Sequence, residues 1–187
     1  MSDRVSQTII LCEDEEHERL TRAYLKRCDL TTRSPYVKPL VASREQQGGN
    51  DAWVLNRFPK ELHACRQRQK HKAKTLLIVL IDADNYSVED RRRQLFERAK
   101  SAGLEQCTEN DPVALLIPKR HIETWIRALL GENVTEEQDC KKWHSPTRDE
   151  IRQAVEKLYE WSRLNAIPSS TCCPSLAAAL AEWRKIG

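Results

Sequence analysis

The sequence predicts an α/β fold in which a mainly parallel sheet is flanked by helices, with further helices added at the C-terminal end. Apolar runs alternate along the chain with segments whose apolar residues recur at helical spacing, which is typical of strands connected through helices. The two strongest runs, Thr8–Cys12 and Thr75–Ile81, are almost wholly apolar, as expected of strands covered on both faces. We expect an α/β domain over residues 1–131 and a helical extension packed on it over residues 132–187.

In the first part of the chain, the strand at Thr8–Cys12 is followed by a helical pattern over His17–Cys28. Tyr36–Ala42 alternates loosely between apolar and polar residues and predicts a second strand. After the break at Gly48–Gly49, the segment Asp51–Gln69 has helical character. We expect Pro59 to kink this helix or to divide it into two, because proline removes a backbone hydrogen bond and clashes with the preceding turn.

After the strand at Thr75–Ile81, Ser87 supplies a helix N-cap and Gly103 follows the last turn, so that a helix is expected over Val88–Ala102. Val113–Ile117 predicts another buried strand, and His121–Leu130 a helix. In the tail, a Thr–Glu capping box and a proline mark the starts of two last helices. These helices can serve as a dimer surface, as a docking site for a partner or as a cover for the sheet.

The composition is that of a globular protein. The 187 residues include 31 Lys and Arg against 28 Asp and Glu, a net charge of +3. The longest apolar run is too short to span a bilayer, and the first residues lack a basic-then-apolar leader. We therefore expect a cytoplasmic protein without membrane contact.

The seven cysteines are scattered, odd in number and without a C-x-x-C pair, so a disulfide framework is not expected. A weaker alternative is a zinc site formed by Cys140, His144, Cys172 and Cys173, although its spacing matches no common zinc finger.

Acidic residues follow both of the strongest strands. Glu13 comes directly after Thr8–Cys12, and Asp82 and Asp84 come directly after Thr75–Ile81. The carboxyl ends of neighbouring parallel strands meet at one edge of the sheet, where the chemistry of α/β proteins gathers. Carboxylates that close repel each other unless a cation neutralises them. Their oxygen atoms suit Mg²⁺ or Mn²⁺.

This arrangement resembles the Toprim domain, the nucleotidyl-transfer and hydrolysis module of topoisomerases and primases. In that family an acidic residue closes the first strand and a D-x-D motif closes the third, which Glu13 and Asp82–Ala83–Asp84 match. The likeness covers roughly Thr8–Leu130 and is closest to small stand-alone Toprim proteins and to the nuclease portions of the overcoming-lysogenization-defect proteins of phage defence. Two positions depart from the family pattern, because Asp14 replaces its usual glycine and His17 its fifth-position acid.

The resemblance implies a Toprim/Rossmann-like fold and a nuclease that depends on Mg²⁺ or Mn²⁺ and cleaves DNA or RNA, tRNA included. Asp82 and Asp84 would hold one cation, and Glu13 would share it or act as the general base. Glu123 stands where some family members carry a further acid and would complete a second metal site. The resemblance also implies an anti-phage defence role and control by a partner ATPase, since this sequence lacks an ATP-binding loop of its own.

Basic residues cluster on both sides of the D-x-D motif in sequence. One run spans Arg57–Lys74, another is Arg91–Arg93, and Lys119 and Arg120 follow the last strand. Such runs attract phosphates, and Lys119 would offset charge that develops on the reacting phosphate. The residues expected to bind nucleic acid are Arg66, Arg68, Lys70, Lys72, Arg91, Arg92, Arg93 and Arg120.

Two other functions remain open. The departures after Glu13 are compatible with a catalytically inactive Toprim fold that serves as a binding or adaptor protein. A receiver-like phosphoacceptor domain would use Glu13, Asp14, Asp82 and Lys119, but the 82 − 13 = 69 positions between Glu13 and Asp82 are too many for the compact receiver pattern.

Overall fold

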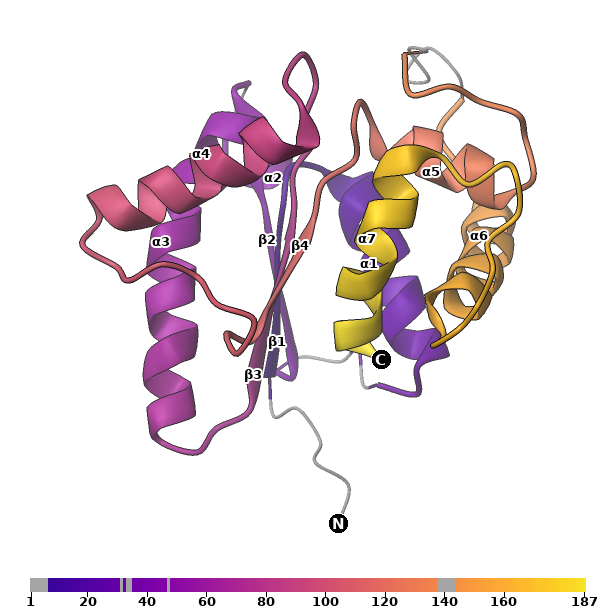
Figure 1. Cartoon of the computed structure of the whole chain (residues 1–187). Helices are drawn as coiled ribbons and strands as arrows, with labels where there is room; N and C mark the ends of the chain where they lie inside the picture. The colour runs from indigo at the N-terminus through magenta and orange to yellow at the C-terminus, as the bar shows by residue number, and fades with distance from the viewer. Residues whose placement is uncertain (1–6, 31, 33–34, 47, 138–143) are drawn as a thin grey trace.

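A computed structural model shows the chain as a four-stranded, entirely parallel sheet between two layers of helices (Figure 1). It describes residues 7–30, 32, 35–46, 48–137 and 144–187. The predicted α/β fold with a parallel sheet is therefore confirmed. The strands, in the spatial order β2-β1-β3-β4, are β1 (Gln7–Cys12), β2 (Val37–Val41), β3 (Thr75–Leu80) and β4 (Val113–Leu116).

Helices cover both faces of the sheet (Figure 1). One face carries α3 (Asn50–Lys70) and α4 (Val88–Ser101), and the short α2 (Ala42–Glu45) directly follows β2. The other face carries α1 (Glu15–Arg27), α5 (Ile122–Leu129), α6 (Arg148–Ser162) and α7 (Pro174–Ile186). Each parallel pair of strands is thus joined through helices, which return the chain to the same end of the sheet.

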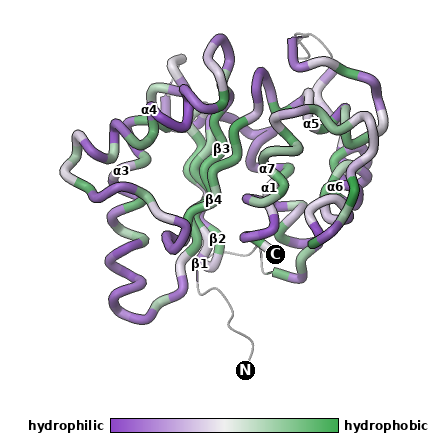
Figure 2. The backbone as a smooth tube through the Cα atoms, in the orientation of Figure 1, coloured by the Kyte–Doolittle hydropathy of each residue, from purple (hydrophilic) through white to green (hydrophobic). Residues whose placement is uncertain are grey.

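Two hydrophobic cores lie on the two faces of the sheet. Along β1, Ile10 and Cys12 belong to the core beneath α1, whereas Ile9 and Leu11 belong to the core beneath α3. Figure 2 shows the strands as the most hydrophobic part of the backbone tube. This double burial explains why the strands are apolar throughout instead of alternating with polar residues.

The predicted division of the long helix at Pro59 is wrong, because α3 runs as one helix from Asn50 to Lys70 with Pro59 inside it. Phe58 and Leu62 are fully buried on either side of the proline, in the core beneath α3. Burial of this apolar face stabilises the helix by more than the single lost backbone hydrogen bond costs, since tertiary packing supplies most helical stability.

The C-terminal helices complete the core on their face of the sheet. The Tyr24 hydroxyl of α1 lies 2.8 Å from Ser162 Oγ of α6, and the Tyr24 and Trp183 ring centroids are 4.7 Å apart. At the open edge of the sheet, the Leu115 N–H of β4 donates to the Glu182 carboxylate of α7 over 3.1 Å. The domain boundary expected near residue 131 stays a prediction. The helix α7 lies against the edge strand β4.

Among the helices that the structure describes, none has both the length and the apolar character needed to cross a membrane.

Candidate metal centre

The structure brings together the acids that follow the first and third strands. β1 and β3 are adjacent and end in register, with Cys12 opposite Leu80. The Glu13 carboxylate accepts a hydrogen bond from the Asp82 backbone N–H over 2.6 Å, although 69 positions separate the two residues. Both side chains are buried, with 7% of Glu13 and 1% of Asp82 exposed.

Asp84 and His121 complete a convergent group of ligand atoms with Asp82. His121, the N-cap of α5, places Nδ1 3.7 Å from Asp82 Oδ2 and 4.0 Å from Asp84 Oδ1. One ligand atom of each of these three residues lies within 4.8 Å of the others. Two carboxylate oxygens and an imidazole nitrogen so placed are a donor set that a divalent cation can bind.

The backbone turn after β3 fixes the position of Asp84. Asp84 has a φ of +52°, in the left-handed region that aspartate tolerates better than most residues. The turn is closed by the Tyr86 N–H, which donates to the Ala83 carbonyl over 2.9 Å. Lys119 Nζ donates to the carbonyls of Tyr86 and Asp84, at 2.9 and 3.4 Å. The Lys119 ammonium group therefore supports this turn by binding two of its backbone carbonyls.

The side chain of His17 contacts the carboxylate of Asp82. Its ring is fully buried, with Nε2 3.0 Å from Asp82 Oδ1 and Nδ1 2.6 Å from Asp14 Oδ1. Burial disfavours the charged ring, but the carboxylates of Asp82 and Asp14 outweigh it and hold the pKa of His17 well above its usual value. Asp14 also caps α1 by accepting the His17 backbone N–H. An imidazolium that bridges two carboxylates fixes the orientation of Asp82.

Two further acids lie in the electrostatic field of Asp82. Burial, followed by the Asp82 carboxylate, raises the pKa of Glu13 to about 8. Burial and Asp82 also raise the pKa of Glu123 in the first turn of α5. Glu123 Oε2 is buried without a hydrogen-bond partner among the described residues. Neither Glu13 nor Glu123 belongs to the convergent group of ligand atoms, although the Asp82 carboxylate raises the pKa of both.

Arg91 is a buried cation that contacts Asp84. Only 2% of its side chain is exposed, and its guanidinium lies 3.2 Å from Asp51 Oδ2 and 3.8 Å from Asp84 Oδ2. It also donates to the Gln94 side chain over 2.9 Å. The sequence suggested Arg91 as a contact for nucleic acid, whereas the structure shows it buried and paired with the partly exposed carboxylates of Asp51 and Asp84.

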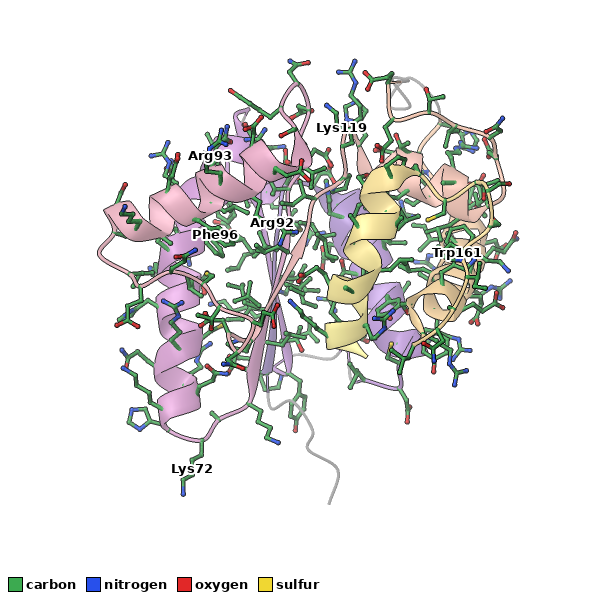
Figure 3. All side chains as sticks on the ribbon, viewed as in Figure 1. Lys72, Arg92, Arg93, Phe96, Lys119 and Trp161 are labelled. Carbon is green, nitrogen blue, oxygen red and sulfur yellow. The ribbon has the colours of Figure 1, made fainter. Side chains whose placement is uncertain are left out.

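The predicted basic residues of the Arg57–Lys74 run lie away from the acidic edge. Lys72 lies at the far end of the molecule from Lys119, and Arg92 and Arg93 lie on α4 (Figure 3). Arg66 is engaged by Asp111, and Arg93 by Asp90 at 2.5 Å. Arg68 and Lys70 are in the last turns of α3, near Lys72. Arg120, next to His121, is half-buried and is the member of the predicted set that directly adjoins the metal centre in sequence.

A basic groove between α1 and α6 was not predicted. It encloses about 510 Å³ over an apolar floor of Ala23, Ile151 and Val155. The sequence gives no sign of it because its cations are divided between two distant helices. Those cations are Arg19, Arg22, Lys26, Arg27, Arg148 and Arg152.

The two histidines of the site were also not predicted to be functional. His17 falls on the same helical stripe as Leu20 and Tyr24, three and seven positions later, which indicates a buried position. His121 follows the last strand at the same sheet edge as Asp82, and this placement is the signal that identifies it. Of the alternative zinc site, Cys140 lies outside the described residues, and the exposed His144 lies 3.3 Å from Glu150.

Comparisons of the chain with protein-family models, with curated proteins and with solved structures find no match. The resemblance to the Toprim domain stays a prediction, and the candidate site rests on its own geometry.

Proposed function

We propose that this protein is a metal-dependent phosphodiesterase that acts on nucleic acid, with Asp82, Asp84 and His121 as the metal ligands. The observation that carries the proposal is the convergence of these three ligand atoms within 4.8 Å at the carboxyl edge of a parallel sheet. Burial and the Asp82 carboxylate raise the pKa values of Glu13 and Glu123, which indicates crowded negative charge that a bound divalent cation would relieve.

The donor set favours Mn²⁺ over Mg²⁺. Carboxylate oxygens suit both cations, whereas imidazole nitrogen is a softer donor that suits transition metals. The ligand set differs from the one that the resemblance implied, because His121 takes the place expected for Glu13 or Glu123. Mg²⁺ remains a candidate if water and Glu123 complete its coordination, since Mg²⁺ keeps several waters in protein sites.

The roles of the protein groups follow from their positions. The bound cation would polarise the phosphoryl oxygen and lower the pKa of the attacking water. Glu13, with a pKa raised to about 8, is suited to accept a proton near neutral pH. His17 positions Asp82, and Lys119 holds the turn that carries Asp84. Arg120, which follows Lys119 after the last strand and is half-buried, would contact a substrate phosphate.

A second candidate function is a binding protein without catalytic activity, as an inactive Toprim fold would be. It is favoured by the contacts that already engage the site, since His17 pairs with Asp82 and Glu13 accepts the Asp82 N–H. A receiver-type phosphoacceptor is less favoured, because Lys119 Nζ donates to backbone carbonyls of Asp84 and Tyr86.

The test is cleavage of single-stranded DNA, plasmid and total tRNA in Mn²⁺, Mg²⁺ or EDTA. We expect cleavage with a divalent cation, none in EDTA, and none by Asp82→Asn. Asp149→Asn is a matched control, because Asp149 is an exposed acid on α6 whose side chain is 76% accessible. If the wild-type protein binds these nucleic acids but cuts none of them in either metal, the binding-protein alternative holds.

A further inference from the structure

A polar pocket adjoins the metal centre on the α4 side of Asp84. It encloses about 440 Å³ between the first turns of α3 and the exposed side of α4. The buried Arg91 joins the two sites, since its guanidinium contacts Asp84 and also lines the pocket. The polar side chains that line the pocket are Asp51, Tyr86, Arg91, Gln94, Glu97, Arg98 and Ser101.

Tyr86 is exposed but firmly held. Its backbone N–H donates to Ala83 and its carbonyl accepts Lys119 Nζ, both over 2.9 Å. The Arg91 guanidinium carbon lies 4.9 Å from the centroid of the Tyr86 ring, so a buried cation supports one face of the ring. Nevertheless 48% of the residue is accessible, and this area must include the other face or the edge of the ring.

An aromatic ring that is supported by a cation on one face and accessible to solvent elsewhere provides a stacking surface. Little conformational entropy is lost when a ligand binds to it. Nucleobases stack on such rings in proteins that hold single strands, and this stacking tolerates any base. The amide of Gln94, the carboxylate of Asp51 and the guanidinium of Arg98 line the same pocket and can form hydrogen bonds with the edge of a base.

We propose that Tyr86 and this pocket bind an unpaired nucleobase of the substrate strand, next to the phosphate held at the metal centre. The inference rests on the proposed function, because it places the base two residues along the chain from the ligand Asp84. It makes the preferred substrate a single strand, a loop or a frayed end, since a paired base is not free to stack on Tyr86.

The shared ligand chemistry is a nucleobase, which a polynucleotide or a free nucleotide can supply. The experiment therefore uses two probes, a single-stranded oligonucleotide that contains one 2-aminopurine and free 2-aminopurine nucleoside triphosphate. Both are titrated with the protein in Ca²⁺ and in EDTA, and stacking is read as quenching of 2-aminopurine fluorescence. Oligonucleotide affinity is measured in parallel by anisotropy.

We expect quenching with the oligonucleotide and little with the triphosphate. Tyr86→Phe should keep the quenching, whereas Tyr86→Leu and Tyr86→Ala should abolish it and weaken oligonucleotide binding about tenfold, within the range for loss of one stacked base. Tyr36→Ala is the matched control, because Tyr36 is 51% exposed but precedes β2 at the opposite edge of the sheet. Unchanged thermal midpoints show that the variants fold.

Three results would overturn the inference: no quenching by the wild-type protein, equal quenching by Tyr86→Leu, or quenching by the triphosphate alone. These results are separable from failure of the proposed function. Asp82-dependent cleavage without Tyr86-dependent quenching contradicts the base pocket and leaves the nuclease intact. Tyr86-dependent quenching without cleavage in any metal supports the base pocket and contradicts the nuclease.

Discussion

Two clusters of charged side chains lie at opposite ends of the sheet, and they shift the pKa values of their carboxyl groups in opposite directions. At the end where β4 begins, Arg66 forms two hydrogen bonds with Asp111, of 2.7 and 2.8 Å, and Asp111 also accepts the Thr108 N–H. The hydrogen bonds from Arg66 hold the pKa of Asp111 below its usual value. At the other end, burial and the crowding of acids raise the pKa values of Glu13 and Glu123.

The difference separates a stabilising cluster from a functional one. Asp111 is matched by a bidentate cation, so its negative charge favours the folded state. The acids around Asp82 outnumber the cations that contact them, and their crowding costs stability that a bound cation would restore. Sites that carry such a cost are frequently functional.

The largest effect should come from removing one ligand at the metal centre. We expect Asp84→Asn to reduce cleavage by roughly 10³-fold, since metal catalysis supplies several kcal/mol of transition-state stabilisation. Asn tolerates the left-handed backbone of position 84, so the fold should be kept. Single-turnover cleavage rates measure the change. Asp111→Asn should cleave at nearly the wild-type rate, and an equal loss in both variants would erase the distinction between the clusters.

The reverse pattern is expected for stability. Arg66→Met should lower the free energy of unfolding by roughly 2–4 kcal/mol, because it leaves the mostly buried Asp111 carboxylate without its cation. Urea denaturation of the metal-free protein measures this loss. Asp84→Asn, which removes one of several repelling charges, should lower the stability far less or raise it. A larger loss for Asp84→Asn than for Arg66→Met would contradict this reading of the clusters.

The pH dependence of stability should differ in sign between the clusters. Glu13 has a raised pKa when folded, so the folded protein binds more protons, and the metal-free protein should lose stability as pH rises from about 4.5 to about 8. The slope from one group is at most about 1.4 kcal/mol per pH unit. Glu13→Gln should flatten this dependence, as measured by denaturation at a series of pH values.

Asp111 has a lowered pKa when folded, so its contribution is present above its unfolded pKa and is lost as pH falls through the folded value. Asp111→Asn should therefore reduce the loss of stability at acid pH. The pH dependence of stability above about pH 5 should stay unchanged. If Glu13→Gln altered only the acid limb, the assignment of a raised pKa to Glu13 would be wrong.

The smallest effect should come from the basic residues at the end of the sheet remote from the metal centre. Lys72→Ala should change oligonucleotide affinity by less than about twofold, whereas Arg120→Ala should weaken it and reduce its dependence on salt. Anisotropy titrations at several salt concentrations measure both. A greater effect of Lys72→Ala would move the nucleic-acid surface to the other end of the molecule.

The sequence predicted the sheet well because the strands are buried on both faces and therefore read as unbroken apolar runs. It also indicated the acidic edge, since the ends of adjacent parallel strands must meet there. The continuous α3 was not predicted, because local rules for proline do not include the packing of Phe58 and Leu62 beneath it.

The composition of the site was harder to predict than its place. The basic run ending at Lys74 lies close to Asp82 in sequence, but β3 separates the two by the length of the sheet. The predicted nucleic-acid contacts assumed that sequence neighbours are spatial neighbours, which a strand prevents. His17 and His121 were missed as functional groups because their partner Asp82 is distant in sequence and only the fold brings them to it.

The most direct test of the metal centre is calorimetric titration of the metal-free protein with Mn²⁺, for the wild type, Asp82→Asn and His121→Gln, with Asp149→Asn as the control. We predict a saturable site in the wild type and in Asp149→Asn, and loss of that site or a severalfold weaker one in the two ligand variants. Absence of binding by the wild type, or equal binding by Asp82→Asn, would contradict the assignment of a metal centre.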